Sequence, residues 1–235
     1  LDEQAGNRSR HSGQPVGDPR MISFDRAEAL RYMGYRGSEP DAAVGESLTR
    51  CAAELQQAVS PKSITARFPL RFLSDTTMQI ADVTIESRNL ARNLKGCTGV
   101  YLMAVTLGVG PDRLITRASA VRMSDAVILQ AVAAAMVESC CDEVNEEVRK
   151  KAAQEGLYCR PRFSPGYGDF SIEHQRDFSR LLDTPRKIGL TVTESCLLAP
   201  IKSVTAVIGL SPEQQDCHRK GCEECSKTDC EFRRS

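Results

Sequence analysis

The chain has 235 residues, of which 41% are apolar and 26% charged, proportions typical of a globular protein with a buried core. Its 31 basic and 31 acidic residues balance, so no overall field directs it toward nucleic acid or an anionic membrane. No continuous apolar run approaches the roughly 20 residues of a membrane span. Residues 1–20 are polar and lack the apolar segment of a signal peptide, so we expect a disordered leader on a cytoplasmic protein.

Helix and strand patterns follow one another in the first half of the chain. The helical patterns begin at capping residues and end at glycine or before proline, whereas the strand patterns are rich in β-branched and aromatic residues. In chain order they predict a helix from Ser23 to near Gly34, a helix at 41–59, strands at 64–72 and 78–85, a helix at 87–96, and a strand buried on both faces at 99–108.

The longest predicted element is a helix over 124–155, capped by Ser124 and Asp125 and ended by Gly156. At 1.5 Å per residue it would be about 45 Å long. One helix and two strands follow it, at 171–183, 188–193 and 203–210. Because the strands and helices do not alternate as regular βαβ units, we expect an α+β fold. It would have a curved, largely antiparallel sheet flanked by helices, with the long helix in a central place.

Glu138 is an isolated carboxylate of the long helix, within the stretch "AVAAAMVESCC" (131–141). Positions 131, 134, 135, 138 and 141 share one helical face and read Ala, Ala, Ala, Glu and Cys. Such small side chains let a backbone or a ligand come close to the carboxylate. The alternative is tight packing against the sheet with Glu138 paired to an arginine, because buried carboxylates are nearly always paired.

A shaped turn is predicted after the long helix, in the stretch "RPRFSPGYGDF" (160–170). Proline fixes φ, and the two glycines permit conformations that are closed to other residues. Arg162 offers a planar fork suited to a carboxylate, and Tyr167 adds an aromatic face and a hydroxyl. An amino-acid nucleoside would present the matching groups. The alternative is an ordinary surface loop.

Glu194 is a weaker candidate, flanked by Thr193 and Ser195 at the end of a predicted strand. A carboxylate and two hydroxyls in this position either line a site or cap a helix, and the segment alone does not distinguish these.

Four cysteines crowd the end of the chain in the pattern Cys-x4-Cys-x2-Cys-x4-Cys: Cys217, Cys222, Cys225 and Cys230. Thiols this close together in an expected cytoplasmic protein indicate a metal site. Closely spaced cysteines favour an iron–sulfur cluster, and zinc is the alternative. We therefore expect a main domain at 21–211 and a short metal-binding tail at 212–235.

Five stretches, taken in order, resemble the activation domain of cobalamin-dependent methionine synthase. They are "GVYLMAVTLG", "VESCCDEVNEEVRK", "RFSPGY", "IEHQRDFSRLL" and "IGLTVTESCLLAPIKSV". In that family an Arg-x-x-Pro-Gly-Tyr segment wraps S-adenosylmethionine (AdoMet), and a glutamate ten residues before Val-Arg-Lys also contacts it. The resemblance, together with the strand-end carboxylate, gives these candidate cofactor-binding residues: Glu138, Arg162, Ser164, Pro165, Gly166, Tyr167 and Glu194.

The sequence departs from the family pattern in three respects. The family has a Tyr-Tyr pair after its last strand, which "VIGLSPEQQDC" lacks. Phe163 and Ser164 stand where the family segment has proline and alanine. The chain also shows no homocysteine, folate or corrinoid domain, so a free-standing relative is expected.

The resemblance implies a module that binds AdoMet and supports reductive remethylation of an oxidised corrinoid. It would be a methionine synthase-type activation component that acts only with a partner carrying the cobalamin, either a methionine synthase core or another corrinoid protein. A low-potential electron donor such as flavodoxin or ferredoxin would supply the electron. The alternative is a metal-bearing adaptor or electron-transfer subunit of a corrinoid protein that does not bind AdoMet.

Overall fold

The computed structural model describes residues 22–35 and 40–214. Within them, one antiparallel sheet has the strand order β3-β2-β1-β4-β8-β5. Its strands are β1 (Lys62–Phe72), β2 (Thr77–Ile80), β3 (Val83–Glu86), β4 (Gly99–Thr106), β5 (Tyr158–Cys159) and β8 (Ser203–Ser211). A separate hairpin joins β6 (Thr191–Val192) and β7 (Leu198–Ala199). The expected leader at 1–20 and metal-binding cysteines lie outside the described residues.

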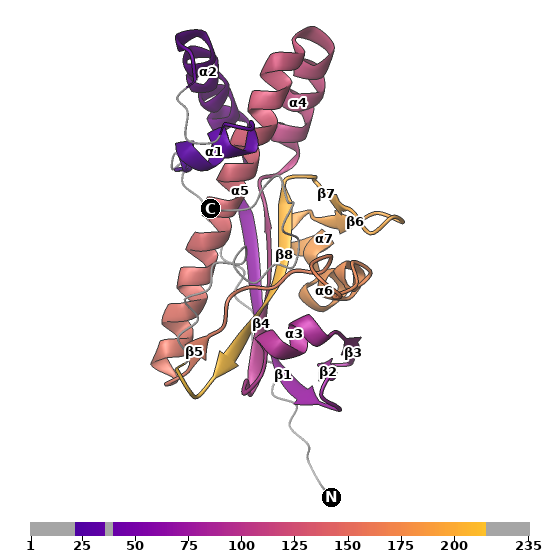
Figure 1. Cartoon of the computed structure of the whole chain (residues 1–235). Coiled ribbons are helices and arrows are strands. Elements are labelled where there is room, and N and C mark those ends of the chain that lie inside the picture. Colours follow the sequence, from indigo (N-terminus) through magenta and orange to yellow (C-terminus); the bar gives the residue numbers. More distant parts are fainter. Residues whose placement is uncertain (1–21, 36–39, 215–235) are drawn as a thin grey trace, which may run out of the picture.

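Helices cover both faces of the sheet (Figure 1). On one side lie α1 (Arg26–Tyr32), α2 (Ala42–Ala58), α4 (Val109–Val121) and the 32-residue α5 (Met123–Gln154). On the other side lie α3 (Arg88–Asn93), α6 (His174–Leu182) and α7 (Thr184–Ile188). The expected α+β architecture with a long helix is confirmed.

The two faces of β4 contribute to two different hydrophobic cores. Met103 and Val105 belong to the core under α5, whereas Leu102 and Ala104 belong to the core under α3 and α6. Successive side chains of a strand point to opposite faces of the sheet, so a strand covered on both faces needs apolar residues at every position. This arrangement explains the uninterrupted apolar run at 99–108.

Helix α5 is, among the described residues, long and apolar enough to cross a membrane by length and composition. It is not a continuous apolar run of that length, because Gln130 and Glu138 interrupt it. Most of the apolar window is buried inside the protein, where Val132, Met136 and Val144 contribute to the core under α5. Core packing accounts for these apolar residues.

Most of the predicted elements are present, with differences that have local causes. The segment expected as one strand at 78–85 is the β2–β3 hairpin, which turns at Ala81 with φ of 52°. Asp25, not Ser23, caps α1, because its carboxylate accepts hydrogen bonds from two backbone amides. Helix α5 starts without a side-chain cap, and Asp125 forms an ion pair with Arg50 instead.

Further elements were missed or misjudged, among them the two-residue strands β5 and β7, which were not predicted. Helix α4 was not predicted, although Gly108, with φ of 80°, separates it from β4. The expected strand at 188–193 is only two residues long, because the chain before it forms α7 around Pro185. The amphipathic helix expected from residue 171 begins at His174.

Candidate functional site

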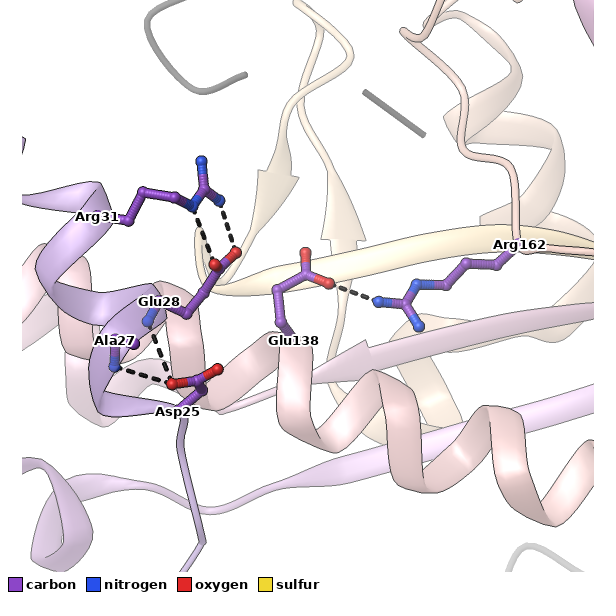
Figure 2. A network of polar contacts seen from close by, with 6 residues as sticks. All are labelled: Asp25, Ala27, Glu28, Arg31, Glu138 and Arg162. Carbon is purple, nitrogen blue, oxygen red and sulfur yellow. Dashed lines mark hydrogen bonds and ion pairs between the residues drawn. The ribbon is translucent and has the colours of Figure 1, made fainter. Parts of the chain in front are cut away.

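Glu138 and Arg162, which are 24 positions apart in sequence, form an ion pair in the structure. Nη2 of Arg162 lies 2.6 Å from Oε2 of Glu138 (Figure 2). The Glu138 side chain is 41% exposed and that of Arg162 is 26% exposed, so solvent and a ligand both have access to the pair. The two strongest candidates from the sequence are thus brought together.

A second carboxylate of α5 completes the environment of Arg162. Its Nη1 lies 2.5 Å from Oδ1 of Asp142, which is 70% exposed. Residues four positions apart lie on the same helical face, so Glu138 and Asp142 reach the guanidinium side by side. Asp142 was not among the site residues predicted from the sequence. The four-residue spacing from Glu138 was the signal that could have identified it.

The small-residue face around Glu138 is used mainly for packing. Ala131, Ala135 and Cys141 are buried, and Ala134 is half-buried. Part of the alternative stated above is therefore met, since this face packs closely and Glu138 is paired with an arginine. The carboxylate itself lies where the face emerges at the surface.

The turn that carries Arg162 is anchored to the sheet and to α3. Phe163 exchanges two backbone hydrogen bonds of 2.9 Å with Val207 of β8. Asp169 accepts hydrogen bonds from the Ser87 hydroxyl (2.5 Å) and from the backbone amides of Arg88 (2.8 Å) and Asn89 (3.1 Å). These bonds lower the pKa of Asp169, with the Ser87 hydroxyl as the main cause. The turn is therefore held at both ends.

Within the turn, each residue of the predicted motif has a distinct place. Pro165 is buried, Ser164 is half-buried, and Tyr167 is 67% exposed. Gly166 and Gly168 have φ of 94° and 57°, in the region that favours glycine, and a Cβ at Gly168 would collide with the Asn89 side chain. The motif thus presents Tyr167 to solvent while Pro165 packs inward.

Arg160, the other arginine of the stretch, has a structural role. Only 4% of its surface is exposed, and its Nη2 donates to the Lys95 carbonyl (3.0 Å) and to the Ser211 hydroxyl (3.3 Å). It ties the turn to the end of β8.

The structure does not bring Glu194 to this pair. Glu194 lies in the loop between β6 and β7 with its side chain exposed, and its carbonyl accepts a hydrogen bond of 2.5 Å from Arg176 of α6. Among the described residues, no hydrogen bond or ion pair joins it to Glu138 or Arg162.

Helix α1 supplies neighbours of Glu138 that the sequence analysis missed. In Figure 2, Glu138 lies between Arg162 and the Glu28–Arg31 ion pair of α1, whose atoms are 2.6 Å apart. Burial, together with the carboxylates of Glu28 and Glu138, raises the pKa of Tyr32 to about 12. The sequence predicted this helix, but no pattern linked it to a residue more than 100 positions later.

Two surface hollows lie away from this pair. One, of about 640 Å³, is bordered by α3 and the β1–β2 loop, with Arg88, Arg92 and Lys95 in its wall. The other, of about 420 Å³, lies between α2, α4 and α5. Neither includes a predicted site residue.

The thiols within the described residues are not arranged for metal binding. Cys140 and Cys141 are adjacent on α5 and buried, and burial raises the pKa of Cys140 to about 11. Among residues 22–35 and 40–214, no group of three or more potential ligands could hold a metal ion. The predicted ligands Cys217, Cys222, Cys225 and Cys230 lie beyond this part of the chain.

Residues 89–228 match the family described as the vitamin B12-dependent methionine synthase activation domain. The chain belongs to this family. The match includes nearly all of α3, the whole of α5, the Arg162 turn and β8. It therefore covers every candidate cofactor-binding residue, but it ends two residues before Cys230.

A solved structure supports the same fold. The crystal structure of the MetH reactivation domain bound to AdoHcy matches with a TM-score of 0.59 and 17% sequence identity, covering 82% of this chain and 75% of that chain. At this identity the likeness concerns the fold alone. None of the curated proteins matches this activation domain significantly.

Proposed function

We propose that this activation domain binds AdoMet at the surface formed by α5 and the 162–167 turn, and that it supports reductive remethylation of a corrinoid held by a partner. The observation that carries the proposal is the direct pairing of Glu138 with Arg162, within a chain that belongs to this family. The structural neighbour was crystallised with AdoHcy, the product that remains when AdoMet has given up its methyl group.

The residues present fit such a ligand. The guanidinium of Arg162 matches the carboxylate of the methionine part in shape and charge. Glu138 accepts hydrogen bonds from the amino group or from the ribose hydroxyls. The exposed ring of Tyr167 and the backbone of Ser164 to Gly166 provide a surface for the nucleoside. Glu194 stays a prediction, since no contact supports its part in this site.

AdoMet would supply an electrophilic methyl group bound to a sulfonium. The partner's cobalt would receive one electron from a low-potential donor of the flavodoxin or ferredoxin class and then accept the methyl group, leaving AdoHcy. This chain would hold and orient the donor, and its own residues would transfer no proton. Because Tyr167 is exposed and the ion pair is accessible, we expect the docked corrinoid protein to complete the walls of the site.

The proposed site predicts a specific pattern of binding defects. Losing a charge-assisted pair of this kind costs about 2–5 kcal/mol, so Arg162→Ala should weaken AdoMet binding by about 30-fold or more. Arg162→Lys should recover only part of the affinity, because an ammonium cannot bind a carboxylate through a planar fork. Glu138→Ala should also weaken binding. Titration calorimetry on the purified chain measures all three.

Arg149→Ala is the matched control. Arg149 is an arginine of α5 that also pairs with a carboxylate of this helix, Glu146, at 2.5 Å, but it takes no part in the proposed site. Its loss should leave the affinity unchanged. If Arg162→Ala and Glu138→Ala both bound AdoMet like the parent, the site would be wrongly assigned.

The functional test uses a corrinoid protein loaded with cob(II)alamin, AdoMet and a low-potential donor. The activation domain should cause methylcobalamin to form, as seen in the absorption spectrum, and Arg162→Ala should slow this conversion more than Glu138→Ala. A chain that docks and passes electrons, while methylation proceeds equally well without it, would establish the adaptor function instead. The absence of the family's tyrosine pair is the observation that favours this adaptor function.

A further inference from the structure

Both terminal nitrogens of Arg162 are occupied by carboxylates of the protein itself. Nη2 faces Glu138 at 2.6 Å and Nη1 faces Asp142 at 2.5 Å. A ligand carboxylate that binds this fork through two parallel hydrogen bonds needs more than one of its nitrogens. In the free protein, both of these nitrogens are therefore already paired with the protein's own carboxylates.

The two carboxylates differ in how firmly they are held. The Asp142 side chain is 70% exposed, whereas that of Glu138 is 41% exposed. Glu138 also lies near Tyr32 of α1, whose pKa its charge helps to raise, while Asp142 lies one turn further along α5. An exposed carboxylate regains most of its hydration when it leaves an ion pair, so Asp142 is the easier one to displace.

We propose that Asp142 acts as a competing carboxylate: in the free protein it holds the Arg162 nitrogen that the amino-acid carboxylate of the ligand takes on binding. This inference rests on the proposed function, because it assumes that Arg162 binds that carboxylate. Asp142 then lowers the affinity for carboxylate-bearing ligands. Glu138 keeps the guanidinium in place and stays available to the ligand's amino group.

The inference predicts a selective gain of affinity when Asp142 is neutralised. Exposed ion pairs contribute little, so Asp142→Asn should bind AdoHcy about two- to fivefold more tightly than the parent. AdoHcy is a suitable probe because its amino-acid part carries no net charge, so removing one negative charge has little general effect on its binding. Asp142→Ala, which retains no polar group at this position, should show the same gain.

Methylthioadenosine separates this explanation from a general change of the surface. It keeps the nucleoside and the thioether but has no amino-acid carboxylate, so its affinity should be the same for the parent and for Asp142→Asn. Glu146→Gln is the matched protein control: it removes the same charge from an exposed α5 ion pair, at Arg149, and should change neither affinity. In an Arg162→Ala background, Asp142→Asn should have no effect.

Calorimetry with AdoHcy and methylthioadenosine on these variants tests whether Asp142 competes with the ligand carboxylate for Arg162. Unchanged or weaker AdoHcy binding by both Asp142 variants, with a parent that binds and an Arg162→Ala variant that does not, would overturn the inference while leaving the proposed function intact. An equal gain for methylthioadenosine would also overturn it. If neither the parent nor the Asp142 variants bound AdoHcy, the proposed function would fail and the inference with it.

Discussion

Replacing Asp169 should loosen the Arg162 turn and destabilise the domain, although Asp169 is exposed and 31 residues away from Glu138 in sequence. Its carboxylate accepts three hydrogen bonds, two from amides in the first turn of α3 and one from the Ser87 hydroxyl. The amides at a helix start have no partner within the helix, and losing a side chain that caps them typically costs about 1 kcal/mol, with about 2 kcal/mol as the upper end. Ser87 still accepts a hydrogen bond from the Leu90 amide, so the helix should persist.

We therefore expect Asp169→Ala to lower the free energy of unfolding by about 1–2 kcal/mol. Urea denaturation at neutral pH would show this as a lower midpoint with an unchanged slope. Asp75→Ala is a suitable control, since Asp75 is an exposed aspartate of the β1–β2 loop and should change stability by no more than about 0.5 kcal/mol. Equal midpoints for Asp169→Ala and the parent would refute the argument that this carboxylate anchors the turn.

The stability lost in Asp169→Ala should depend on pH, and the sign of this dependence follows from the pKa of Asp169. The hydrogen bonds lower the pKa of Asp169 below its value in the unfolded chain, which is about 3.9. Its stabilising contribution is therefore fully present above that unfolded value and is lost as the pH falls through the lower pKa of the folded state. The difference between the parent and Asp169→Ala should accordingly shrink under acidic conditions. A difference that grew as the pH fell would contradict the assigned cause.

Two further predictions concern other parts of the chain. A Cβ at Gly110 would collide with the carbonyl of Ala58 where α4 crosses the end of α2, so Gly110→Ala should destabilise the fold by about 1–3 kcal/mol. At Gly45 of α2 a Cβ would meet only the Arg26 side chain, at a normal contact distance of 3.8 Å, so Gly45→Ala should stabilise the fold by up to about 1 kcal/mol. Thermal denaturation of the two variants tests both signs. Anaerobically purified protein should contain one metal centre bound by the four C-terminal cysteines, and it should be brown if the centre is an iron–sulfur cluster and colourless if it is zinc. Removing residues 212–235 should abolish metal binding and leave the far-ultraviolet circular dichroism of the domain unchanged. A native chain that contains no metal would contradict the predicted metal site.

Elements were predictable from the sequence where local signals agreed with tertiary packing. The strand at 99–108 and the helices α2, α3 and α5 combine periodicity with clear boundaries. Helix α4 was missed because its sequence is nearly as polar as it is apolar, and only Pro111 and Ile115 are buried. The β2–β3 hairpin was read as one strand because its turn places Ala81, not glycine, at positive φ.

The candidate site shows the same division between local and long-range information. Glu138 and the Arg162 turn were recognisable because each is unusual within its own stretch: a carboxylate among small apolar residues, and an arginine before a proline and two glycines. Asp142, Glu28 and Tyr32 are ordinary residues of amphipathic helices, and nothing in their own stretches sets them apart. They became part of the site only through the packing of α1 on α5 and the course of the turn.

The two alternatives for Glu138, close packing and ligand contact, turn out to be compatible because they concern different parts of one helical face. Ala131, Ala135 and Cys141 are buried, so close packing fixes α5 against its neighbours. A helix fixed in this way holds Glu138 and Asp142 at a set distance from the anchored turn, and the arginine can meet both without a large rearrangement. Pre-positioned charges lose less entropy when a ligand binds than mobile ones do. The ion pair of the free protein is, on this argument, the arrangement that makes an amino-acid zwitterion a suitable ligand: it already places an acceptor for the amino group beside a donor for the carboxylate.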